Sequence, residues 1–177
     1  MTTLAAANVS LTYDDQGIVN GEGGFVLTND GLAGILSGDI DVNVGVAAVS
    51  GRLGIRINST PGDVDQTIDF GDNTIAIKFA GTDNATAAGG PFVSVFGEDL
   101  TLSIGDFVLI KGGFAFSSGP GGSQTFAGSD LFVFMGEGPI LLPDGDTINN
   151  SAKGVLLTGS NIGLVKFSDG TFALEAK

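Results

Sequence analysis

Apolar and polar residues alternate with a period of two along most of this chain. Such alternation is typical of β-strands that bury one face. Glycine interrupts every longer stretch and no segment keeps a 3.6-residue period, so we expect almost no helix. The alternation predicts strands most clearly at residues 38–44, 53–57, 74–79, 92–96, 100–104, 107–110, 113–116, 131–134 and 155–158.

Two short turns between alternating stretches predict β-hairpins. Ser168-Asp169-Gly170 separates residues 162–167 from residues 171–175, and an Asp-Gly turn in this setting is a strong hairpin signal. Gly105-Asp106 is a candidate two-residue turn between residues 100–104 and 107–110. Adjacent hairpins favour antiparallel pairing. Longer loops are expected at residues 59–62, 82–90, 117–123 and 143–151.

A short phrase recurs about every 31 residues: a small residue or Gly, then Asp or Asn, then alternating apolar residues. Its anchors are Asn8, Asp39, Asn73, Asp99, Asp130 and Asn161. Repetition at a fixed period indicates units that bury their apolar faces on their neighbours. Each anchor also has a simpler interpretation, an Asx-turn at the start of a strand.

A longer repeat lies over the short one. Residues 38–57 resemble residues 98–117, and residues 1–45 match residues 123–177, so the chain reads as one unit of about 130 residues and the start of a second. We predict a single repeat-built domain over residues 1–177, with an all-β fold. The expected architecture is an elongated two-layer stack of antiparallel β-hairpins, and a β-solenoid is the alternative.

Composition excludes several classes of function. The net charge of −13 leaves no basic face for nucleic acid and disfavours anionic membrane surfaces. No apolar stretch approaches the ~18 residues of a membrane helix, so we expect no membrane insertion. The hydrophobic content of 42% is enough for a core. We therefore expect a folded protein that does not bind nucleic acid.

Catalytic chemistry has few candidate groups. The chain has no Cys and no His, which excludes disulfides, Ser-His-Asp and Cys-His catalysis and the common zinc sites. A carboxylate pair, as in glycosidases, is the enzyme class left open, but no pair is singled out. We predict that the protein is not an enzyme.

Loop-bound calcium is the cofactor that the sequence suggests. The chain has 20 acidic residues, of which only four are Glu, and Asp in a loop suits hard cations. The candidate ligands are Asp14, Asp15, Asp63, Asp65, Asp144 and Asp146, with Asp69 and Asp72 as a further pair. None of these loops fits the EF-hand or the calcium-binding nonapeptide. The competing interpretation is that they are solvated turn residues.

Three phrases, at residues 31–38, 49–55 and 167–174, resemble tandem modules of very large bacterial surface and secreted repeat proteins. Those modules are Cys-free, β-rich and rich in Gly, Asp and Thr. The resemblance implies an extracellular or cell-surface role in an adhesin, a biofilm matrix or a filament. The chain is then either a segment of a giant protein or a complete self-assembling subunit.

Repetition without catalytic groups favours a non-enzymatic structural module. Its expected partners are other copies of itself or adjacent repeats, joined by strand pairing at the ends. Specifically, residues 171–175 of one copy are expected to meet the N-terminal strands of the next, head to tail. The alternative is a calcium- or glycan-binding β module of a secreted protein.

Overall fold

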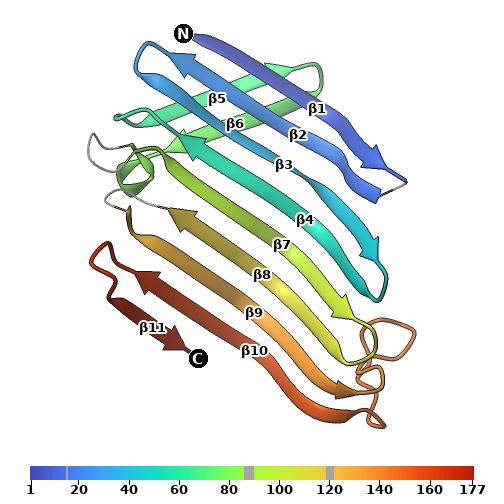
Figure 1. The fold of residues 1–177 in the computed structure, drawn as a ribbon. Coiled ribbons are helices and arrows are strands. Elements are labelled where there is room, and N and C mark those ends of the chain that lie inside the picture. Colours follow the sequence, from blue (N-terminus) through green and yellow to red (C-terminus); the bar gives the residue numbers. More distant parts are fainter. Residues whose placement is uncertain (15, 86–89, 119–121) are drawn as a thin grey trace.

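The computed structural model describes residues 1–14, 16–85, 90–118 and 122–177. Nine strands form one open antiparallel sheet, and two further strands form a separate hairpin (Figure 1). The all-β prediction is confirmed, because the only helical element among the described residues is the single 3₁₀ turn Gly81–Asp83. None of the described residues forms a helix that is long and apolar enough to cross a membrane.

The sheet is a meander, so neighbours along the chain are neighbours in space, with one excursion after β4. The separate hairpin consists of β5 (Val64–Phe70) and β6 (Asn73–Phe79). In spatial order the sheet contains β1 (Thr2–Tyr13), β2 (Gln16–Thr28), β3 (Gly31–Val44), β4 (Ala47–Asn58), β7 (Phe92–Ile104), β8 (Val108–Ser118), β9 (Gln124–Glu137), β10 (Lys153–Lys166) and β11 (Phe172–Ala176).

Each predicted strand lies in an observed strand, apart from Phe107, which lies in a turn. The C-terminal hairpin is confirmed by the pairing of Lys166 with Phe172. The turn near Gly105 has three residues rather than two, because Ile104 pairs with Val108. Gly105 adopts a positive φ of 51° there, and the Phe107 N–H donates to the Ile104 carbonyl at 3.3 Å.

The predicted loops are found in part. Residues 59–62 connect β4 to β5, and residues 143–151 lie in the connection between β9 and β10. In the predicted loop at 82–90, residues 86–89 lie outside the described residues. In the predicted loop at 117–123, residues 119–121 lie outside them, and Ser117 and Ser118 belong to β8.

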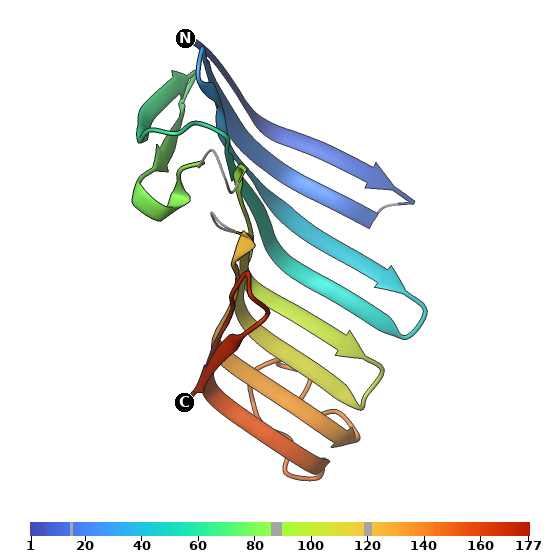
Figure 2. The same ribbon diagram turned by 60° about the vertical axis from the view of Figure 1, so that its left-hand side comes forward.

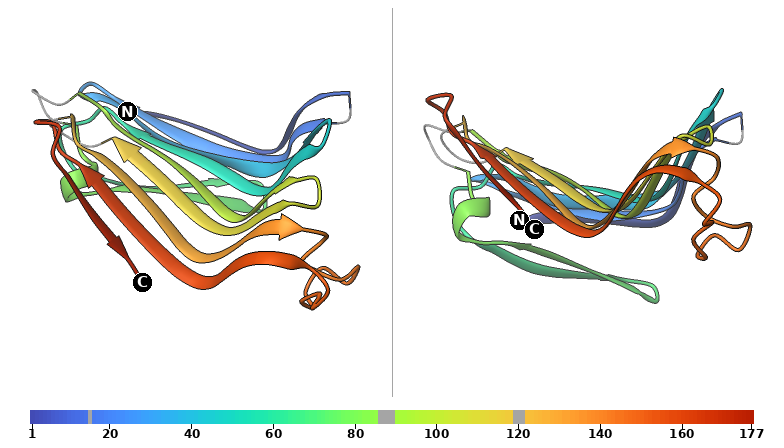
Figure 3. Two further views of the ribbon diagram at one scale, coloured as in Figure 1. Left: turned by 60° about the horizontal axis from the view of Figure 1, so that its bottom comes forward. Right: turned by 90° about the horizontal axis from the view of Figure 1, so that it is seen from below.

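The long strands bend near their middle, so the sheet is a shallow V in cross-section (Figure 3). Register shifts mark β-bulges along this bend, and a bulge both kinks a strand and increases its twist. The residues with positive φ along the bend are Asn8, Asn20, Gly51, Asp99, Gly112, Asp130 and Gly159. Asn and Asp tolerate this left-handed conformation better than other residues with side chains.

The recurring anchors therefore have a structural meaning that the sequence did not reveal. Asn8, Asp99 and Asp130 lie at bulges inside strands and not at strand starts. Asp39 and Asn161 belong to the same bend, since each bonds to the bend residue of the neighbouring strand. Asn73 is the exception, because it begins β6 in the separate hairpin.

The convex face of the V is partly covered by the chain itself. The β5–β6 hairpin lies across the outer face of β1, β2 and β3 (Figure 2). Its contact with the sheet forms the main core: Val26, Ala33, Val64, Ile75, Ile77, Phe79 and Phe92. On the other arm, the connection between β9 and β10 brings Ile140 close to Phe134, and both are buried.

Buried polar contacts fix the hairpin to the sheet. Asn58 is fully buried, donates to the Asp83 carbonyl at 3.0 Å, and accepts from the backbone N–H and hydroxyl of Thr60 at 2.9 and 2.7 Å. Arg56 pairs with Asp83 at 3.1 Å and lies over the ring of Phe79, 4.8 Å from its centroid. These contacts give the buried polar groups partners, and without partners their burial would destabilise the folded protein.

Candidate interaction surface

The concave face of the sheet carries most of the exposed apolar side chains. Ala33 belongs to the core beneath β5–β6, and Leu36, three residues further along β3, points to the opposite face because side chains alternate. Leu36 pairs with Gly23 on one side and with Ile55 on the other, so these residues share the concave face. In the structure, no other described element covers this face (Figure 3).

An apolar row crosses this face on all nine strands. Paired residues in adjacent strands give the row Ala6, Gly23, Leu36, Ile55, Val95, Phe116, Phe126, Leu164 and Leu174. A second row, beyond the bend, contains Val42, Val49, Leu102, Ile110, Val133 and Leu157. In β1, β2, β7, β9 and β10 a bulge reverses the alternation at the bend, which keeps apolar residues on the same face of both arms.

Charge is confined to the margins of this face. Lys166 occupies the end of β10 on one arm, and the pair Lys153 and Glu137 occupies the strand ends on the other arm. Between these margins, the pairing places no charged side chain of the described residues on the concave face. The face is therefore uncharged over nearly its whole extent, in a chain of net charge −13.

The size of the face exceeds what a monomer normally exposes. Eight of the strands have 11 to 14 residues, and at a spacing of about 4.8 Å and a length of about 40 Å they give a face on the order of 1,500 Å². The largest apolar patch on a typical monomer is roughly 300–600 Å². Leu11 and Leu174, at opposite ends of the sheet, are 75% and 63% exposed. An exposed apolar face of this size is a candidate interaction surface.

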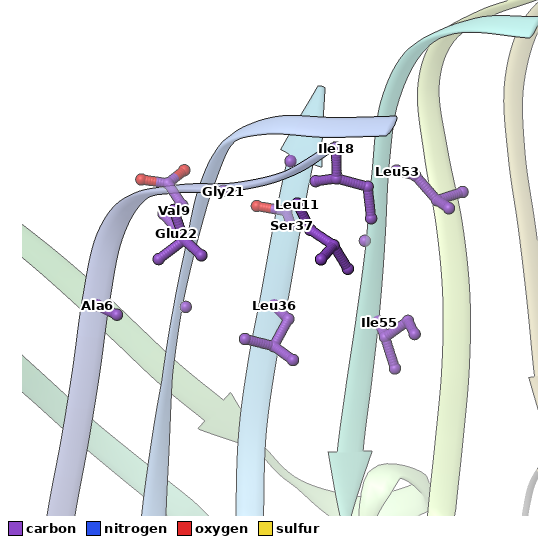
Figure 4. Close-up of a pocket in the computed structure, with 13 residues that line it drawn as sticks. Ala6, Val9, Leu11, Ile18, Gly21, Glu22, Leu36, Ser37, Leu53 and Ile55 are labelled. Atoms are coloured by element: carbon purple, nitrogen blue, oxygen red, sulfur yellow. The ribbon is translucent and has the colours of Figure 1, made fainter. Parts of the chain in front are cut away.

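A trough lies on the concave face near the bend of the first four strands (Figure 4). Its volume is about 270 Å³, and apart from Glu22 and Ser37 its lining is apolar, with the large side chains Val9, Leu11, Ile18, Leu36, Leu53 and Ile55. Gly38 leaves room for Ile18, and Gly23 leaves room for Leu36, because a Cβ at either glycine would overlap that side chain. The glycines of β2 and β3 thus allow large apolar side chains to line the trough.

The two edges of the sheet differ in length and charge. β1 is the first edge strand, spans twelve residues, and contains no Asp, Glu, Lys, Arg or Pro. β11 is the other edge strand and spans five residues, and Glu175 there pairs with Lys177 at 2.7 Å. Charged residues and short length are the usual means of protecting an edge, so β1 is the less protected of the two.

Polar residues gather on the convex side of the bend. Arg52 pairs with Asp39 at 3.1 Å and with Glu22, and donates to the Ser37 hydroxyl at 2.9 Å. The side-chain bond from Asn20, together with Arg52, holds the pKa of Asp39 below its ordinary value. A polar hollow of about 480 Å³ lies further along the bend. It is lined by Glu98, Asp99, Thr101, Lys111, Gly112, Gly113, Ser129 and Asp130.

The structure separates the carboxylates of the first Asp-x-Asp loop. Asp63 accepts from the Asn84 side chain at 2.6 Å and from the Gly81 N–H at 3.3 Å. Asp65 lies in β5 and forms an exposed ion pair with Lys78 at 3.4 Å. The two side chains therefore have different partners on the hairpin.

The remaining candidate ligands lie in turns. Asp144 accepts from the Thr147 hydroxyl at 2.6 Å and from the backbone N–H groups of Thr147 and Asp146, and these bonds lower the pKa of Asp144. Asp14 has a positive φ of 52° after β1, and Asp15 lies outside the described residues. Asp69 accepts from Thr74 at 2.8 Å.

No group of three or more Asp and Glu side chains arranged to hold a metal occurs within residues 1–14, 16–85, 90–118 and 122–177. Calcium binding at these loops stays a prediction.

Comparison of the chain with protein-family models, with curated proteins and with solved structures finds no match in any of the three.

Proposed function

We propose that the chain is a non-enzymatic structural module that associates with other copies of itself or with adjacent repeats. The single observation that carries this proposal is the uncharged apolar face across all nine strands of the sheet. Its residue types bind by excluding water and offer no group for acid, base or nucleophilic chemistry. The resemblance to bacterial repeat proteins supports a place in an extracellular filament, matrix or adhesin.

The distribution of charge favours association through the uncharged concave face of each copy. Two copies of net charge −13 repel one another wherever their charged faces approach. The concave face is the part of the surface on which that repulsion is smallest and the gain from burial is largest. A stable interface buries about 800 Å² on each partner, and the concave face exceeds this area.

The predicted two-layer stack belongs to this proposal. Within one chain, the second layer is limited to β5 and β6 on the convex face. One arm of a second sheet packed on one arm of the concave face would supply a second layer there, at the spacing of about 10 Å that is usual for packed sheets. The extracellular location and the stacking of repeats are also part of the proposed function.

Ile55→Glu tests the proposal because Ile55 lies in the apolar row and is 43% exposed in the single chain. We expect the unmodified chain to associate at micromolar concentration in light scattering and the variant to remain monomeric with unchanged circular dichroism. Thr67→Glu, on the exposed side of β5, adds the same charge as a control and should associate like the unmodified chain. Equal association of Ile55→Glu and Thr67→Glu would overturn the proposal.

A further inference from the structure

The edge strand β1 has an unusual composition for its position. A chain with 27 charged residues places none of them on this twelve-residue edge, although charged side chains commonly prevent edge-to-edge pairing. Leu4, Leu11 and Tyr13 project from it with exposures of 67%, 75% and 90%. We propose that β1 pairs with β1 of a second copy, antiparallel and about a two-fold axis that passes between Ala7 and Asn8.

The bulge in β1 selects this register. On the arm before the bulge, Leu4 and Ala6 face the concave side, and on the arm after it, Val9 and Leu11 do so. A two-fold axis between Ala7 and Asn8 places Leu4 opposite Leu11 of the second copy, and Ala6 opposite Val9. Apolar residues then meet on the concave face in both halves of the pair, and cross-strand apolar pairs of this kind stabilise sheets.

The same axis continues the shape of the molecule. It runs through the bend and exchanges the two arms of the V, so the bends of the two sheets join. The result is one eighteen-stranded sheet, twice the nine strands of one chain, with a continuous apolar concave face. A neighbouring register shifts the bends apart or places concave residues opposite convex ones.

Head-to-tail pairing of β1 with β11 fits the geometry less well. In a nine-stranded antiparallel meander the first and last strands run in the same direction, so a copy added by translation would form a parallel β11–β1 pair. β11 pairs with residues 162–166 of β10 and thus follows one arm of the sheet. The arm of β1 after the bulge would find no strand beside it there.

The β1 pairing rests on the proposed self-association but uses a different surface, so the two are separable. A chain without Cys accepts single spin labels cleanly. A label at Ala7→Cys should lie within about 10 Å of its counterpart in the dimer. A label at Tyr13→Cys should lie at most about 36 Å from its counterpart, the value for an unbent strand with a rise of about 3.3 Å per residue. Head-to-tail pairing predicts about 43 Å at both positions, the width of nine strands.

Two charge-pair variants test the register itself. Thr3 and Thr12 are exposed, and the proposed axis places each opposite the other in the partner copy. T3K/T12K should abolish the short distance at position 7 because like charges then face one another, whereas T3K/T12E should keep it. Absence of the short distance in the unmodified background, or equal effects of both variants, would overturn the β1 pairing. If Ile55→Glu still abolished association in that case, the proposed function would stand without this edge.

Discussion

At the scale of single residues, the bend depends on side chains that accept a left-handed backbone. Asp99 and Asp130 have φ values of 50° and 51° within strands, and Asn8 and Asn20 have 56° and 52°. Such angles cost other residues about 1–2 kcal/mol, and glycine avoids that cost. Among the recurring Asp/Asn anchors, Asn8, Asp99 and Asp130 therefore mark where the sheet bends through their own backbone conformation.

Substitution of Asp130 tests this account. Asp130→Val should destabilise the protein by roughly 1–3 kcal/mol, because a β-branched residue is poorly tolerated at positive φ, whereas Asp130→Gly should be close to neutral. Asp41→Val is the matched control, because Asp41 is exposed on β3 and is not among the positive-φ residues. Urea unfolding gives the three free energies. Equal losses for Asp130→Val and Asp41→Val would contradict a conformational role of Asp130.

At the scale of elements, the alternation predicted individual strands but not their full length. Residues 100–104 and 92–96 were predicted as two strands and form one, β7, because the bulge at Asp99 reverses the alternation without ending the strand. For the same reason the sequence could not show that both halves present apolar residues to one face. The separation of β5 and β6 from the sheet was also invisible, since their alternation resembles that of the other strands.

For the candidate interaction surface, the sequence predicted only that apolar residues form it, and not where it lies. The alternation indicates that each strand has an apolar face, but which face the chain itself covers depends on where β5–β6 and the β9–β10 connection fold back. The Asp-x-Asp pairs drew attention because of their spacing. In the structure Asp63 lies just before β5 and accepts from Asn84, whereas Asp65 lies within β5 and pairs with Lys78.

The turn between β10 and β11 should confer a pH dependence on stability. Asp169 accepts from the Thr171 hydroxyl at 2.6 Å and from the Thr171 N–H at 2.9 Å, and these bonds lower the pKa of Asp169 in the folded state. A carboxyl whose pKa is lower in the folded state stabilises the protein above its unfolded pKa of about 3.9, and this contribution disappears as pH falls through the folded pKa.

Asp169→Ala should therefore melt at a lower temperature than the unmodified chain at pH 7. The difference should shrink as the pH falls below about 4 and vanish once Asp169 is protonated in the folded state. Calorimetric melting temperatures of both proteins between pH 2 and pH 8 provide the measurement. A difference that stays constant over this range would show that the ionised carboxylate contributes nothing.

At the scale of the whole molecule, charge and apolar surface are segregated onto opposite faces. The convex bend carries ion pairs such as Arg52 with Asp39, whereas the concave face has charges only at its margins. In the proposed self-association, the charge of −13 opposes the approach of two copies and burial of the uncharged face favours it. The balance between these two effects should depend on the ionic conditions.

Salt should accordingly strengthen self-association of this protein. Repulsion between two acidic copies is screened over a Debye length that shortens from about 30 Å at 0.01 M to about 10 Å at 0.1 M salt, whereas burial of apolar surface is not weakened. Sodium sulfate should strengthen association more than sodium chloride at equal ionic strength, because sulfate is excluded from protein surface and favours burial. Sedimentation equilibrium across both salts measures the dissociation constant. Association that weakens as salt rises would indicate an interface held by ion pairs, and would place it on the convex bend instead of the concave face.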